Sequence, residues 1–265
     1  MNDSSHEWEK MPFCGQPTTI FHSPVYLLGD WLQELKTLRD RKAAKTPHYN
    51  LNLVLMACAF TEASLNRGLI NAAMYRLDQI PRTDGNDAAR KILEDHIESL
   101  VNGDIYGNPF PKTPLGPTPT PYARLVDAIL GVNLTQCIPL EMAKALRCLF
   151  LFRNMMIHGQ TVSADGVMPR HYADPVQSYR VGGNDKMREL EAHLRDQQLL
   201  KPMTLTGGIG FPFLNDAVID HFLRAMVEFF RTLQGAILNE NLRHAFGDGL
   251  PQEIFMILAG EAFMF

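Results

Sequence analysis

Apolar residues recur at every third or fourth position along four long stretches of the chain, which is the spacing that places side chains on one face of an α-helix. This periodicity predicts long helices over residues 24–45, 49–80, 139–158 and 215–244. Two shorter helices are predicted between the second and third of these, over residues 87–101 and 122–130. The fold class predicted by the pattern is therefore mainly α, a helical bundle.

The helix predicted over residues 139–158 is apolar on nearly every side, as expected of a helix wrapped by other helices or by a partner chain. Gly159 follows it, and glycine is common just past a helix end because it adopts the left-handed conformation without steric cost. The last turn nevertheless carries Arg153, Asn154 and His158. Polar groups among so much apolar surface must have hydrogen-bond or ion-pair partners, or must take part in the function of the protein.

The spacing of these three residues determines which can act together. Asn154 and His158 are four residues apart, so they share one face of the helix, while Arg153 projects to the flank of that face. Two copies related by a two-fold axis could present such patches to one shared cleft. The carboxyl end of a helix favours a charged imidazole, and a histidine near neutrality beside an arginine suits acid–base work on a phosphodiester.

The arrangement Arg153-Asn154-x-x-x-His158 on a late apolar helix resembles the HEPN superfamily. A second stretch, residues 60–66, carries Glu62 and Asn66 and is similar to the acidic helix that packs against the Arg/His helix in several HEPN groups. The resemblance implies an all-α domain that dimerises. It also implies, commonly, a metal-independent endoribonuclease of toxin, defence or RNA-processing systems, although the superfamily includes catalytically silent members.

The resemblance assigns roles to individual residues. Arg153, Asn154 and His158 would be catalytic, and Glu62 and Asn66 would support them, with no metal and no cofactor. The expected partners are a second copy of the chain, an RNA substrate and an antitoxin protein. The alternative is a non-catalytic HEPN-like helical module that binds a nucleotide or a protein. Two roles are also considered for Glu62. It orients Arg153 or His158, or it lies on the flank of its helix, where it pairs with Arg67 or faces solvent.

The overall charge limits how RNA could be bound. The net charge is −4 and the isoelectric point is about 6.1, so RNA cleavage would need a local basic cleft instead of a globally positive surface. The densest basic run is formed by Lys36, Arg39, Arg41, Lys42 and Lys45. It is interpreted either as a solvated last helical turn or as a phosphate-contacting patch.

Cysteine usage and the termini bear on the compartment. The four cysteines show no C-x-x-C spacing, and Cys58 and Cys148 lie in apolar helical runs, so buried thiols in a reducing cytoplasm are expected. Residues 1–9 are polar and acidic and contain no apolar signal core. No uninterrupted apolar run reaches the roughly 18–20 residues of a membrane span, so a cytoplasmic protein without membrane partners is predicted.

The domain organisation expected is one HEPN-like helical domain over residues 1–265. A proline-rich, extended connection occupies residues 108–121, where helix and sheet are both disfavoured. Residues 160–212 are expected to be an insertion between core helices with a small irregular or β-containing structure, including a β-type run at 177–181. The apolar tail, residues 254–265, is expected to dock on the body or on a partner chain.

Overall fold

The computed structural model describes residues 24–41, 47–102, 110, 120–158, 164–167, 177–181, 185–200 and 213–259. Within these ranges the protein is mainly helical, which confirms the predicted fold class. The long helices are α1 (Val25–Arg41), α2 (Pro47–Gln79), α3 (Asp87–Asn102), α6 (Leu140–Ile157) and α8 (Asp216–Ala236). The shorter elements are η3 (Asp84–Asn86), α4 (Pro121–Leu130), α5 (Leu134–Cys137), β1 (Ala164–Val167), β2 (Gln177–Val181), α7 (Asp185–Asp196), α9 (Glu240–Asp248) and α10 (Gln252–Ala259).

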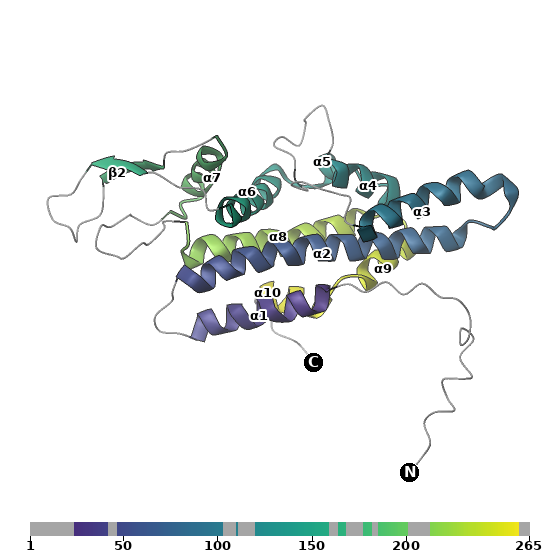
Figure 1. Cartoon of the computed structure of the whole chain (residues 1–265), viewed down its shortest axis with the longest axis horizontal. Coiled ribbons are helices and arrows are strands. Elements are labelled where there is room, and N and C mark those ends of the chain that lie inside the picture. The colour runs from purple at the N-terminus through teal and green to yellow at the C-terminus, as the bar shows by residue number, and fades with distance from the viewer. Residues whose placement is uncertain are drawn as a thin grey trace, which may run out of the picture.

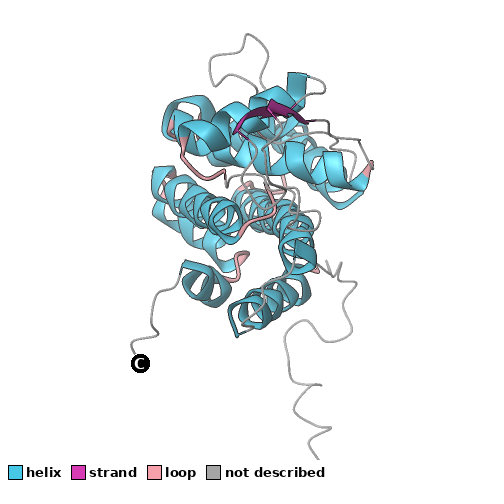
Figure 2. Cartoon of the chain, turned by 90° about the vertical axis from the view of Figure 1, so that its left-hand side faces the viewer, coloured by secondary structure: helices cyan, strands magenta, loops and turns pink. Residues whose placement is uncertain are grey.

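Helices α2 and α8 form the centre of the bundle and run side by side along its long axis (Figure 1). On one side α6 packs on both of them, with α7 against α6 and α4 against α2. On the other side lie α1, which packs on α2, and α10, which packs on α1 and α8. The view along the bundle axis shows these helices as successive layers around the central pair (Figure 2).

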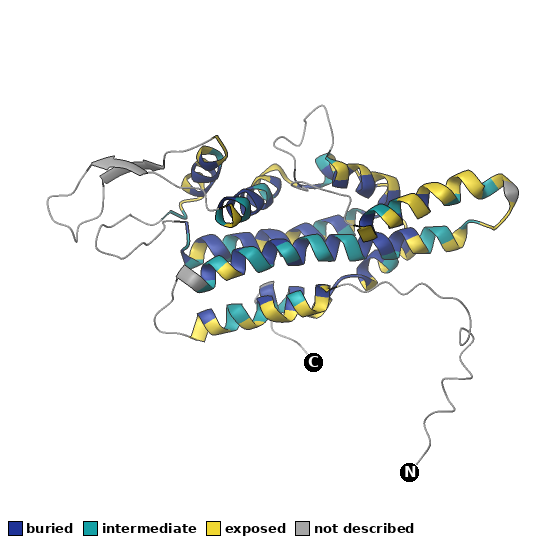
Figure 3. Cartoon of the chain, viewed as in Figure 1, coloured by how far each residue is buried: buried dark blue, intermediate teal, exposed yellow. Residues whose placement is uncertain are grey.

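Aromatic side chains fill the space between these layers, and the buried faces of α2, α6 and α8 turn toward one another (Figure 3). Phe110 is buried and reaches this core from the segment between α3 and α4: its ring centroid lies 5.7 Å from that of Phe150 and 5.0 Å from that of Phe229. The predicted proline-rich connection, residues 108–121, otherwise lies outside the described residues except for Thr120 and Pro121.

The single long helix predicted over residues 215–244 is wrong, because the chain breaks it into α8 and α9. Ile237 and Asn239 both take extended backbone conformations between the two helices. The Asn239 side chain then accepts a hydrogen bond from the backbone N–H of Leu242 at 3.0 Å and caps α9. The apolar periodicity continues through this corner, and it therefore concealed the break.

The basic run at the end of α1 includes one residue that cannot contact a phosphate. Arg39 is 2% exposed, and its guanidinium donates hydrogen bonds to Asp40 and to Asp220 of α8 at 2.9 and 2.6 Å. Lys36 is paired with Asp40 at 2.9 Å. Arg39 therefore ties α1 to α8, and the interpretation of this run as a phosphate patch loses its central member. Residues 42–46 lie outside the described residues.

The region between α6 and α8 belongs partly to the bundle. Strands β1 and β2 pair antiparallel, with Ala164 opposite Val181. Helix α7 then returns to the core, where Leu190 and Leu194 are fully buried. The predicted insertion over residues 160–212 therefore contains one core helix, because apolar residues four apart give α7 a face that packs on α6.

The apolar C-terminal region was expected to dock on the body or on a partner chain, and its described part, α10, packs on the body of the same chain. Phe255 of α10 is buried, and its ring centroid lies 5.3 Å from that of Phe60 in α2 and 4.9 Å from that of Phe230 in α8. Residues 260–265 lie outside the described residues.

Among the described residues, one helix, over Tyr49–Gln79, is long and apolar enough to cross a membrane by length and composition alone. Of its most apolar window, 56% is buried inside the structure, and the core helix of a soluble protein passes the same test. The absence of a membrane span stays a prediction.

Candidate functional site

An ion pair joins the middle of α2 to the last turns of α6. The Arg153 Nη2 atom donates a hydrogen bond to Glu62 Oε1 at 2.8 Å, and both side chains are partly exposed, 24% for Arg153 and 32% for Glu62. The Arg153 guanidinium carbon also lies 5.5 Å from the ring centroid of Phe150, within the range of a cation–π contact. Glu62 and the aromatic ring therefore hold Arg153 in one orientation while part of its side chain remains accessible.

Helix α4 adds a second polar contact beside this ion pair. The Tyr122 hydroxyl donates a hydrogen bond to Asn66 Oδ1 at 2.9 Å. Burial and the nearby Glu62 charge raise the pKa of Tyr122 to about 12, so its hydroxyl remains protonated at neutral pH. Thr120 fixes the start of α4 by accepting a hydrogen bond from the backbone N–H of Ala123 at 3.1 Å.

The electrostatics of the pair are set by its partial burial. Burial raises the pKa of Glu62, and the charge of Arg153 opposes that rise. Beneath the pair, Cys58 is fully buried and its thiol donates to the carbonyl oxygen of Leu149, with a sulfur–oxygen distance of 3.7 Å. Burial raises the pKa of the Cys58 thiol well above its usual range, which excludes it as a nucleophile at neutral pH.

His158 and Asn154 lie at the carboxyl end of α6. His158 is exposed and caps the helix: its backbone N–H donates to the carbonyl oxygen of Asn154 at 3.1 Å. Within the described part of the chain, neither side chain makes a hydrogen bond. Gly159, expected just past the helix end, lies outside that part. The imidazole is therefore presented to solvent at a helix terminus, where a substrate could reach it.

The structure brings together some of the predicted site residues. Glu62 and Arg153 are in direct contact, which is the arrangement expected if Glu62 orients the arginine, and the alternative pairing with Arg67 is not formed. Asn66 is joined to Tyr122. Asn154 and His158 share the end of α6, and they do not contact Glu62 or Asn66 through any hydrogen bond found among the described residues.

Sequence reasoning missed Tyr122 as a member of this site. One signal could have found it: a tyrosine in the first turn of an apolar helix buries its ring and needs a partner for its hydroxyl. Asn66, on a core helix with apolar neighbours, needs a partner for the same reason. These two requirements could have been matched, although nothing in the sequence shows that Tyr122 and Asn66 lie close together in the fold.

A second polar pair lies between α7 and α8, away from the ion pair. The Nε2 atoms of His193 and His221 are 3.1 Å apart, so one ring donates a hydrogen bond and the other accepts it. His221 therefore has a hydrogen-bonding partner within the fold. Among the described residues, no group of three or more side chains could hold a metal ion.

The histidine pair makes the stability of the fold depend on pH. Burial, and then the neighbouring His193 and Arg224 charges, lower the pKa of His221 to about 4. Burial also lowers the pKa of His193; the Lys144 charge adds to this shift, and the Glu141 and Asp196 charges oppose it. An unfolded histidine titrates near 6.5, so the unfolded chain binds more protons between about pH 6.5 and 4. The free energy of unfolding is therefore expected to decrease as the pH is lowered from about 6.5 to 4.

Urea unfolding at several pH values would measure this slope. The variant His221→Gln keeps a hydrogen-bonding group but cannot titrate, so its stability should decline less between pH 6.5 and 4. His244→Gln serves as control, because it makes the same substitution at a histidine that is 72% exposed on α9. Equal slopes for the two variants would contradict the assignment to the buried pair.

Comparison of the chain with protein-family models, with curated proteins and with solved structures gives no significant match.

Proposed function

We propose that the protein is a metal-independent endoribonuclease of HEPN type that acts on single-stranded RNA. The observation that carries the proposal is the ion pair between Arg153 and Glu62. It joins the helix with the Arg-Asn-x-x-x-His pattern to the acidic helix, which is the relation that the HEPN resemblance anticipates. A toxin or defence effector, with an antitoxin partner, is the setting that this class suggests.

The proposed reaction is an internal transfer at phosphorus. The 2′-hydroxyl of the substrate attacks the adjacent phosphorus, its oxygen–phosphorus bond forms, and the bond to the 5′-oxygen of the next nucleotide breaks. One imidazole accepts the proton of the 2′-hydroxyl and an imidazolium protonates the leaving 5′-oxygen. The products carry a 2′,3′-cyclic phosphate and a 5′-hydroxyl, and no water or redox partner is consumed.

Each residue has one role in this proposal. His158 transfers protons, because its side chain is exposed at a helix end and an imidazole can both accept and donate a proton. Arg153 stabilises the charge that develops on the phosphoryl oxygens, with Glu62 and Phe150 fixing its guanidinium. Asn154 orients the histidine or a phosphate oxygen. Two copies of the chain would bring two such patches to a shared cleft.

A non-catalytic binding module is the second candidate. The ion pair favours it as well, because Glu62 neutralises the arginine that would otherwise contact phosphate, and the net charge of −4 opposes RNA binding. In that case Arg153 would serve mainly to connect α2 and α6.

Cleavage of a labelled single-stranded RNA in EDTA separates the two candidates. The wild-type protein should produce 2′,3′-cyclic phosphate ends, and His158→Ala should lose about 10²–10⁴-fold in rate, the range of general acid–base catalysis. The control His244→Ala removes another exposed histidine and should cut at the wild-type rate, with thermal melts showing that all three proteins are folded. Absence of cleavage across varied RNAs would favour the binding module, and cleavage by His158→Ala or its loss in EDTA would refute the mechanism.

A further inference from the structure

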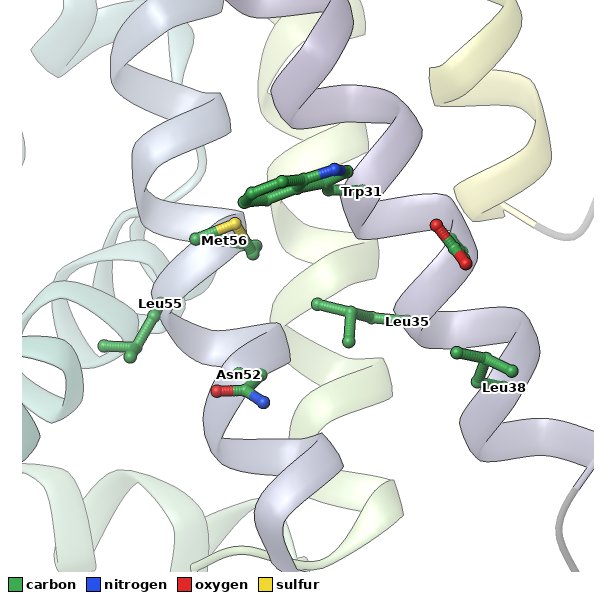
Figure 4. Close-up of a pocket in the computed structure, with 7 residues that line it drawn as sticks. Trp31, Leu35, Leu38, Asn52, Leu55 and Met56 are labelled. Carbon is green, nitrogen blue, oxygen red and sulfur yellow. The ribbon is translucent and has the colours of Figure 1, made fainter.

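A hollow of about 400 Å³ lies between α1 and α2 (Figure 4). Trp31 and Leu35 line it from α1, and Leu55 and Met56 line it from α2. The Trp31 indole extends from α1 toward Met56, so it closes one end of the hollow and turns a ring face into it (Figure 4). The volume is within the range of sites that bind small molecules. The hollow therefore offers a flat aromatic wall and apolar sides to a planar ligand.

Two polar side chains border the hollow among these apolar walls. Glu34 lies on α1, three residues from Trp31, and Asn52 lies at the end of the hollow away from Trp31 (Figure 4). Both residues are exposed, and neither side chain has a hydrogen-bond or ion-pair partner within the described part of the chain. Their carboxylate and amide groups are thus available to the polar edge of a ligand whose flat face lies on Trp31.

One face of α2 connects the hollow to the ion pair of the candidate site. Glu62 and Asn66 follow Leu55 by seven and eleven residues, so at 100° per residue all three lie nearly on one line along the helix. Each of them is half-buried. Glu62 lies about 10 Å along α2 from Leu55 and holds Arg153 at 2.8 Å. A nucleotide whose base occupies the hollow would therefore have its neighbour close to the arginine.

We propose that the hollow is a base-binding subsite that selects guanine in single-stranded RNA. Its part in the reaction rests on the proposed function, since the bound guanosine adjoins the nucleotide whose phosphate Arg153 contacts. Proteins read unpaired RNA bases by stacking them on aromatic side chains and by hydrogen bonds to their Watson–Crick edges. Trp31 supplies the stacking surface, and the Met56 thioether adds a favourable contact to an aromatic ring.

The Glu34 carboxylate selects guanine among the four bases. Guanine presents two adjacent donors, N1–H and the N2 amino group, and a carboxylate accepts both with its two oxygens. The amino groups of adenine and cytosine adjoin a ring nitrogen that carries no proton and repels the second oxygen, and uracil presents one N–H between two carbonyl oxygens. Asn52 can donate to the guanine O6 atom on the same edge. The charge of Glu34 also disfavours phosphate here and directs the RNA backbone toward Arg153.

Isothermal titration calorimetry of the full chain with guanosine 5′-monophosphate tests the subsite without requiring cleavage. The wild-type protein should bind this nucleotide about tenfold or more tightly than the adenosine, cytidine and uridine monophosphates, because guanine alone satisfies both carboxylate oxygens. Inosine 5′-monophosphate lacks the 2-amino group, so it should bind about tenfold more weakly than guanosine 5′-monophosphate.

Substitutions on α1 test the two recognition elements separately. Trp31→Ala should weaken binding of guanosine 5′-monophosphate by about tenfold or more, because the stacking surface is lost. Glu34→Gln should bind the guanosine and inosine nucleotides with similar affinity. Tyr26→Ala and Asp30→Asn are the matched controls: they alter an exposed aromatic and an exposed acidic side chain of α1 outside the hollow, and both should bind as wild type does. Circular dichroism melts should match wild type for every variant.

Cleavage assays distinguish failure of this subsite from failure of the proposed function. In EDTA, an RNA with a single guanosine should be cut beside it about tenfold or more faster than the same RNA with inosine at that position, and Glu34→Gln should remove the difference. Selective binding of guanosine 5′-monophosphate without any RNA cleavage would support the subsite and refute the endoribonuclease. Absence of binding, equal affinities for all five nucleotides, or equal losses for Trp31→Ala and Tyr26→Ala would overturn the subsite and leave the endoribonuclease standing.

Discussion

Arg153→Ala is expected to lose RNA cleavage and to destabilise the fold, with the second effect larger at pH 7 than at pH 4. The arginine would supply charge stabilisation to the transition state, and removing one such group typically costs about 10²–10³-fold in rate. Its removal also leaves Glu62 partly buried without its partner at 2.8 Å. Arg153→Lys should recover little activity, because an ammonium cannot reproduce the planar fork of a guanidinium on phosphate oxygens.

The pH dependence follows from the direction of the Glu62 shift. Burial raises the pKa of Glu62 and Arg153 opposes this rise, so without the arginine the folded-state pKa moves further above its unfolded value. The folded variant then binds more protons than the unfolded chain above pH 4.5, and its free energy of unfolding declines as pH rises through that window. Urea unfolding of Arg153→Ala and wild type at pH 4 and pH 7 measures the difference.

A matched double variant separates the two effects of this arginine. Arg153→Ala with Glu62→Gln removes the uncompensated carboxylate, so it should regain much of the stability lost by Arg153→Ala without regaining cleavage. If the double variant cleaves RNA, Arg153 acts in the structure and not on the substrate. The comparison therefore distinguishes a role of Arg153 on the substrate from a role in holding α2 and α6 together.

Hydrophobic periodicity predicted most helix ends to within two residues, but it did not predict the break between α8 and α9. The stretch predicted as 215–244 keeps its apolar rhythm through Leu238, yet Leu238 is 93% exposed and sits at the corner between α8 and α9. From the sequence alone, a leucine in the turn between two helices cannot be told from a leucine on the apolar face of one long helix. Asn239 is a preferred capping residue, but asparagine also occurs within helices, so its presence alone did not establish a break.

Of the contacts between distant segments, one could be predicted from the sequence and another could not. Glu62 and Arg153 could be matched in advance because a resemblance paired their two helices, and the structure brings them into contact. Arg39 and Asp220 are 181 residues apart in the sequence, and the residues around each of them do not distinguish it from an ordinary surface charge. A buried arginine in a basic run therefore resembles its solvated neighbours in sequence, and only the packing of α1 on α8 distinguishes it.

Phe152→Ala should reduce the free energy of unfolding by about 3–5 kcal/mol, the range for removing a fully buried aromatic side chain. Phe152 is 0% exposed in α6, and its ring packs edge-on against Phe213, with 6.1 Å between centroids, and against Phe222 of α8 at 6.5 Å. Both neighbours are themselves buried, so the surrounding helices cannot close over the space without moving α6. Urea denaturation with both variant and wild type at neutral pH measures the loss.

Ile157→Ala is the matched control, because Ile157 lies on the same helix but is 57% exposed. Its substitution should change stability by no more than about 0.5 kcal/mol, the usual range for an exposed position. A similar loss for the two variants would mean that the end of α6 is packed more tightly than its exposure indicates. A loss below about 1 kcal/mol for Phe152→Ala would show that the aromatic cluster can collapse around the missing ring, and α6 would then be a less rigid support for Arg153 than the proposed reaction requires.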